Sequence, residues 1–196
     1  MQKKCSVSEE IYTHEYLWRS STALAQRLDI EADDQHHLLL PALLVTFMAY
    51  EAFINFSGFV IHPELWSDEK TNFKGKTLEY KISIIAKALP TFVWQKEIKP
   101  YKTIRKLSMF RDLVAHGKVQ AKQYITRQQP DGSHFQFEHS WDEHLSREAV
   151  LEARADIKVF CQELLEAMRC HSEHLHLSFN AFDGSLASGE SLSIIS

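Results

Sequence analysis

The chain is poor in the residues and motifs that would assign it to a secreted, zinc-binding or nucleotide-loop class. Its 196 residues include three cysteines, Cys5, Cys161 and Cys170, which form no even framework and no CxxC pair. Disulfide scaffolds need more cysteines, so we expect a reducing, cytoplasmic location. The N-terminal MQKKCSVSEE has no apolar run behind its lysines, which argues against a secretory signal. The patterns GxxxxGK[ST], GxGxxG, GxSxG and HExxH are also absent.

An excess of positive charge is missing too. The chain has 22 Lys and Arg against 26 Asp and Glu, a net charge of -4, so it has no global attraction for nucleic acid. Any contact with RNA requires a local basic patch, and cations do cluster between residues 96 and 122. They are Lys96, Lys99, Lys102, Arg105, Lys106, Arg111, Lys118 and Lys122. The alternative is that these cations are simply the solvated face of a helix.

One long apolar run requires a membrane check. The stretch from Leu38 to Ile61 is mostly apolar and long enough to span a bilayer. However, Glu51 and Asn55 lie near its middle and Pro41 near its start, and a central carboxylate costs several kcal/mol in lipid. We therefore predict a buried core helix and no membrane partner.

Apolar spacing predicts an all-α, up-and-down helical bundle. The expected helices cover residues 8–28, 33–60, 76–89, 100–117 and 146–174. Between the last two, Val119, Ala121, Gln123 and Ile125 alternate before a Pro-Asp-Gly turn at 130–132, which predicts a β-hairpin insertion at about 119–140. Residues 1–178 would form one domain, and the small, polar residues 179–196 would form a flexible tail.

The most informative stretch is FRDLVAHGK, residues 110–118, at the predicted end of the fourth helix. Arg111 and His116 have complementary chemistry for cleaving a phosphodiester. A guanidinium remains charged and presents several donors to phosphate oxygens. An imidazole titrates near neutrality, so it can accept a proton from a 2'-hydroxyl or donate one to a leaving oxygen. This chemistry requires no metal ion.

Spacing alone does not make this pair a site, because the chain has 11 histidines and other arginines stand at similar intervals from them. Arg127 precedes His134, and Arg169 precedes His174, but neither pair lies at the end of a helical segment followed by glycine. Five residues also advance a helix by roughly 140°, which separates the two side chains. They converge only if the helix loosens before Gly117 or if a partner helix supplies a second pair. The structural alternative pairs Arg111 with Asp112 or Glu51.

The two motifs RDLVAHG and AYEAFIN, the latter at residues 49–55, resemble those of the HEPN domain, a helical family of prokaryotic toxins, defence systems and CRISPR-associated nucleases. The resemblance implies a metal-independent endoribonuclease that acts as a homodimer, with a composite cleft and 2',3'-cyclic phosphate products. Arg111 and His116 would be catalytic, and Asp112 would orient them. Glu51 and Asn55 would be supporting residues.

RNA would be the substrate, with Lys102, Arg105, Lys106 and Lys118 as further RNA-binding residues. The resemblance also allows an antitoxin protein as a partner, although Lys118 stands where the toxins paired with a nucleotidyltransferase carry a modified tyrosine. Two alternatives stay open. The first is a non-catalytic HEPN-type binding module for a nucleotide, RNA or a partner protein, and the second is a structural helical dimer without a ligand.

No cofactor is expected, and no metal site. Cys170, His171, His174 and His176 are of the types that bind zinc, but an exposed polar helix end explains them better.

Overall fold

The computed structural model describes residues 12–30, 35–117, 141, 144–171 and 180–182. This part of the chain is all-α, with its helices packed as a bundle and no strand among the described residues. The helices are α1 (Thr13–Arg27), α2 (Gln35–Ile61), α3 (Pro63–Trp66), α4 (Glu69–Asn72), α5 (Leu78–Ala88), α6 (Tyr101–Ala115) and α7 (Arg147–His171). The predicted hairpin at about 119–140 lies outside the described residues.

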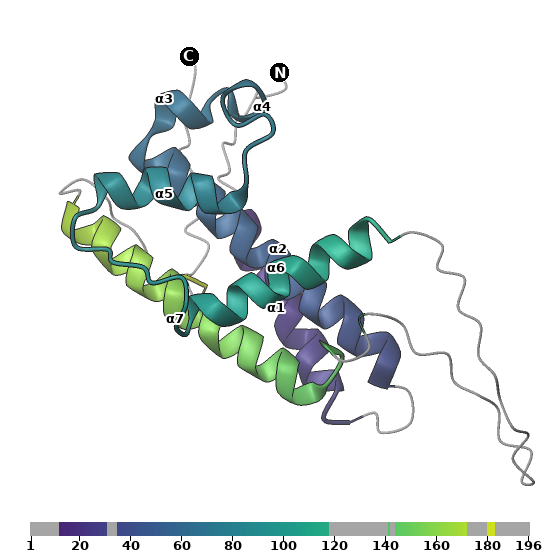
Figure 1. Cartoon of the computed structure of the whole chain (residues 1–196). Helices are drawn as coiled ribbons and strands as arrows, with labels where there is room; N and C mark the ends of the chain where they lie inside the picture. The colour runs from purple at the N-terminus through teal and green to yellow at the C-terminus, as the bar shows by residue number, and fades with distance from the viewer. Residues whose placement is uncertain (1–11, 31–34, 118–140, 142–143, 172–179, 183–196) are drawn as a thin grey trace, which may run out of the picture.

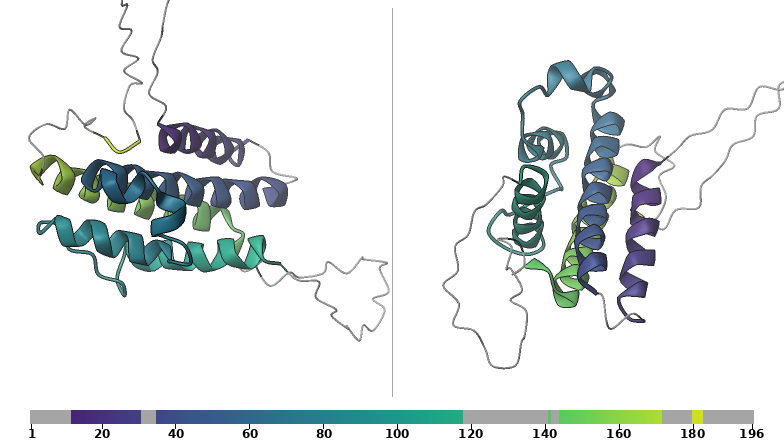
Figure 2. Two further views of the ribbon diagram at one scale, coloured as in Figure 1. Left: turned by 90° about the horizontal axis from the view of Figure 1, so that it is seen from above. Right: turned by 90° about the vertical axis from the view of Figure 1, so that its right-hand side faces the viewer.

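The long helix α2 is the centre of the bundle. It contacts α1, α3, α5, α6 and α7. The helices form three layers, with α1 on one side, α2 and α7 in the middle, and α5 and α6 on the other side (Figures 1 and 2). Because α2 has neighbours on both sides, it can be apolar on nearly every face.

By length and composition, the stretch His37–Ile61 could cross a membrane. In the structure, half of the most apolar 18-residue part of this stretch is buried inside the bundle. Its fully buried side chains include Phe47, Tyr50, Phe53 and Ile54.

The sequence pattern locates most helix ends well. Helix α2 ends at Ile61, directly before His62 and Pro63, because proline cannot continue the hydrogen-bond ladder. Helix α5 begins after Thr77, whose Oγ1 accepts a hydrogen bond from the backbone N–H of Tyr80 at 3.2 Å. The short helices α3 and α4 were not predicted, because each is a single turn without a repeating apolar pattern.

A short segment near the C-terminus lies against the bundle. Phe182 is 2% exposed, and its ring stacks on that of Trp18 with the centroids 4.2 Å apart and the planes at 10°. The backbone N–H of Ala181 donates to Gln162 Oε1 at 3.2 Å. Within the predicted flexible tail, 179–196, these described residues are therefore packed against the helices, and the rest lies outside the described part.

Candidate functional site

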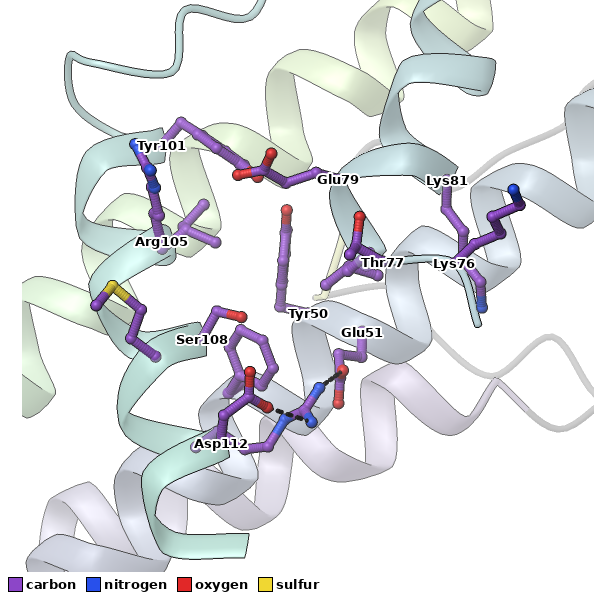
Figure 3. Close-up of a pocket in the computed structure, with 15 residues that line it drawn as sticks. Tyr50, Glu51, Lys76, Thr77, Glu79, Lys81, Tyr101, Arg105, Ser108 and Asp112 are labelled. Carbon is purple, nitrogen blue, oxygen red and sulfur yellow. Dashed lines mark hydrogen bonds and ion pairs between the residues drawn. The ribbon is translucent and has the colours of Figure 1, made fainter. Parts of the chain in front are cut away.

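The side chain of Arg111, near the end of α6, turns inward toward α2. Its Nη1 donates to Asp112 Oδ1 at 2.7 Å, and its Nη2 pairs with Glu51 Oε1 (Figure 3). The guanidinium carbon lies 5.2 Å from the ring centroid of Phe47, within the range of a cation–π contact. The side chains of Arg111 and Glu51 are each 30% exposed, so the ion pair is partly shielded from water but accessible from one side.

This ion pair joins the two motifs on which the sequence interpretation depends. Glu51 belongs to the AYEAFIN stretch and Arg111 to RDLVAHG, 60 residues later. The structural alternative predicted that Arg111 would pair with Asp112 or Glu51, and it pairs with both. Two carboxylates face one guanidinium, so the local charge is slightly negative before any ligand arrives.

The carboxyl group of Glu51 is electrostatically unusual. Burial raises its pKa, and the Asp112 carboxylate adds to this effect, whereas Arg111 and Lys81 oppose it. Burial acts in this direction because it disfavours the charged form of a carboxylic acid. Glu51 therefore accepts a proton more readily than an ordinary glutamate does, despite its contact with Arg111.

His116 lies just beyond the end of α6, and its side chain is exposed. Its backbone N–H donates to the Asp112 carbonyl at 2.9 Å, which closes the last turn. Arg111 points toward α2, and His116 follows it by five residues, which on an ideal helix separates two side chains by roughly 140°.

The predicted supporting residue Asn55 lies one turn beyond Glu51 on α2. Its Oδ1 accepts a hydrogen bond from Lys81 Nζ at 2.9 Å, and Lys81 also pairs with Glu69. Asn55 therefore holds a lysine of α5, and no described hydrogen bond links it to Arg111. The sequence interpretation missed Lys81, because the pattern of α5 gave only its apolar face.

Three of the predicted RNA-binding cations lie exposed on α6. Lys102, Arg105 and Lys106 are all exposed, and Arg105 Nη1 pairs with Glu97 Oε1 at 3.2 Å. Their spacing puts them on the face of α6 that leads toward His116. Lys118 lies outside the described residues.

A pocket of about 500 Å³ opens beside Arg111, between α2, α5 and α6 (Figure 3). Its lining includes aromatic, acidic and basic side chains. They are Phe47, Tyr50, Glu51, Lys76, Thr77, Leu78, Glu79, Lys81, Tyr101, Ile104, Arg105, Ser108, Met109, Arg111 and Asp112. The sequence interpretation did not identify this pocket, although Phe47, Tyr50 and Glu51 have the i, i+3, i+4 spacing of one helix face.

Among the described residues, no three His, Cys, Asp or Glu side chains gather as metal ligands would. Comparisons of the chain with known protein families, curated proteins and solved structures find no match.

Proposed function

We propose that this protein is a metal-independent endoribonuclease of HEPN type that acts as a cytoplasmic homodimer, with a role as a toxin or defence effector. The observation that carries the proposal is the Glu51–Arg111–Asp112 cluster, since it brings together the two motifs that resemble the family. The arginine stands at the wall of an open pocket, close to the end of a helix that exposes a histidine.

The two residues would divide the chemistry between them. His116 takes the proton of a 2'-hydroxyl as this oxygen attacks the adjacent phosphorus, or it protonates the departing 5'-oxygen. Arg111 holds the non-bridging oxygens and stabilises the negative charge that develops on them. The products are a 2',3'-cyclic phosphate and a free 5'-hydroxyl, and the hydroxyl of the RNA itself is the nucleophile.

Glu51 fits a role as the group that the phosphate displaces. Arg111 is already neutralised by carboxylates, so a phosphate must compete with them for the guanidinium. Burial raises the pKa of Glu51, which makes its negative charge costly to keep. When a phosphate takes the guanidinium, Glu51 loses its ion-pair partner, and its burial then favours uptake of a proton by this carboxylate.

A second copy would complete the site, because the five-residue spacing separates the side chains of Arg111 and His116 by roughly 140° within one chain. Exposed apolar side chains on α2 and α6 offer a contact surface for it: Met48 is 48% exposed, Met109 67% and Leu113 37%. The dimer would bring His116 of one chain toward the cleft of the other.

The direct test incubates purified protein with single-stranded and structured RNA in EDTA. We expect cleavage that leaves 2',3'-cyclic phosphate ends and is lost, by at least about a hundredfold, in Arg111→Ala and His116→Ala. Matched controls are Arg27→Ala and His171→Ala, which remove the same side-chain types from the last turns of α1 and α7. Both controls should cleave like the wild type.

Circular dichroism and sedimentation must first show that each variant keeps its fold and oligomeric state. If folded wild type cuts no RNA, or if Arg111→Ala and His116→Ala cut as well as the controls, the nuclease proposal is wrong.

The second candidate is a non-catalytic HEPN-type binding module. The contact of Arg111 with two carboxylates favours it, because an arginine held in this way can serve packing alone. Under this alternative, RNA or a nucleotide binds without being cleaved, and His116→Ala leaves the affinity unchanged.

A further inference from the structure

The hydroxyl of Tyr50 is the most unusual polar group in the pocket. Tyr50 is 0% exposed, it lines the pocket, and its hydroxyl has no hydrogen-bond partner. Figure 3 shows this hydroxyl directed toward Glu79 and Tyr101. A buried hydroxyl without a partner costs about 1–3 kcal/mol, so its presence points to a ligand that supplies the missing bond.

The end of the pocket near Tyr50 is rich in acceptor atoms. Glu79 lies in the first turn of α5, and its Oε2 accepts from Lys96 Nζ at 2.9 Å. Tyr101 also forms a side-chain hydrogen bond with Glu79, and burial together with this carboxylate raises the pKa of Tyr101. A carboxylate has about four lone-pair sites, so Glu79 keeps room for another donor.

The walls of the pocket suit a flat, partly apolar group. Phe47, Tyr50 and Tyr101 contribute aromatic rings, and Ile104 contributes an aliphatic surface. A volume of about 500 Å³ falls in the usual range of small-ligand sites, roughly 300–1,000 Å³. Aromatic rings are also the surfaces on which proteins stack the bases of single-stranded RNA.

Cations also line the pocket. Lys76 and Arg105 line it and are exposed, with Arg105 at the end near Tyr101, and Arg111 stands on the wall next to Glu51, away from Tyr101. A ligand with a flat donor group at one end and an anionic group at the other matches this distribution of charge.

We propose that the pocket between α2, α5 and α6 binds the base of a nucleotide next to the scissile phosphate, and that it selects bases with an exocyclic amino group. The amino group donates to the Glu79 carboxylate, and the Tyr50 hydroxyl donates to a ring or carbonyl acceptor of the same base. The phosphate of this nucleotide then lies on the side of Arg111. This inference rests on the proposed function for the identity of the ligand as RNA.

The test measures binding without cleavage. Equilibrium titrations with GMP, AMP, CMP and UMP compare the wild type with Tyr50→Phe, which keeps the ring and removes only the unpartnered hydroxyl. Tyr80→Phe is the matched control, since Tyr80 lies on α5 and does not line the pocket. We expect at least one amino-bearing nucleotide to bind more tightly than UMP. Tyr50→Phe should weaken its binding about tenfold, while Tyr80→Phe should not change it.

Two results would overturn the inference: no nucleotide bound more tightly than UMP, or equal affinities of Tyr50→Phe and the wild type. The proposed function fails separately, in the cleavage assay. Tyr50-dependent nucleotide binding without RNA cleavage would support the pocket and refute the nuclease. RNA cleavage without nucleotide binding would support the nuclease and refute the pocket.

Discussion

A buried histidine should make this protein sensitive to mild acid. His14, on α1, is 4% exposed and packs among aromatic rings, with centroid distances of 4.8 Å to Phe56, 5.3 Å to Phe53 and 6.2 Å to Phe182. Burial lowers its pKa from 6.5 to about 4, because the charged imidazolium loses its hydration in this cluster. The substitution His14→Phe tests this, because it keeps an aromatic ring and removes the titratable group.

The magnitude follows from the difference between the two pKa values. Above pH 6.5 the imidazole is neutral in both the folded and the unfolded chain, so its contribution to stability is complete. As the pH falls from 6.5 to 4, the unfolded chain binds a proton that the folded chain does not. Each pKa unit corresponds to about 1.4 kcal/mol, so the folded state loses about 2 kcal/mol by pH 5 and about 3 kcal/mol by pH 4.

Urea unfolding of the wild type and of His14→Phe would be measured at intervals from pH 7.5 to 4.5, with circular dichroism as the signal. At each pH, the free energy of unfolding of the wild type is subtracted from that of the variant. The change of this difference with pH reports the titration of His14. Other titrating groups cancel in this difference, including Glu51, whose raised pKa acts with the opposite sign because its protonation favours the folded state. We expect the difference to shift by about 2 kcal/mol in favour of the variant between pH 7.5 and 5.

The matched control is His171→Phe, since His171 is exposed at the end of α7. It should keep the pH profile of the wild type. If the free energies of unfolding of the wild type and of His14→Phe change in parallel from pH 7.5 to 4.5, burial does not lower the pKa of His14, and the packing described for this side chain is wrong.

Two packing predictions follow. A Cβ at Gly58 would lie 2.0 Å from Trp66 Cε2. Gly58→Ala should therefore lower the free energy of unfolding by about 3 kcal/mol, as measured by urea unfolding. A loss below about 0.5 kcal/mol would contradict the packing of α3 on α2. Phe182→Ala should cost about 3–5 kcal/mol in urea unfolding, because it removes a ring that is 2% exposed; a cost below about 1 kcal/mol would mean that residues 180–182 do not dock in solution.

The sequence predicted the main helices because their signals are local. Apolar spacing and the prolines at 63 and 100 placed α2, α5 and α6 close to their observed positions. The one-turn helices α3 and α4 could not be found in this way, since their formation depends on contacts such as that of Trp66 with Gly58. Helix α6 ends just before Gly117, as the sequence pattern predicted.

The candidate site was only partly visible in the sequence. Arg111, Asp112 and Glu51 could be named from their motifs, and the structure brings these three together. The pocket beside them depends on Tyr50, Glu79 and Tyr101, which come from three helices. Each of these residues looks like an ordinary core or surface position in its own helix, so no local pattern identifies the group.

Local sequence patterns were therefore enough to predict where the main helices lie and which residues have the chemistry to bind a phosphate. Both properties depend on side-chain type and on spacing within a few turns of one helix. The packing of the helices was needed to show that Arg111 faces α2, that His116 is exposed to solvent and that the unpartnered hydroxyl of Tyr50 lies in a pocket beside Arg111. These features depend on how helices distant in the sequence pack together, because packing decides which polar groups lose water and which partners they meet.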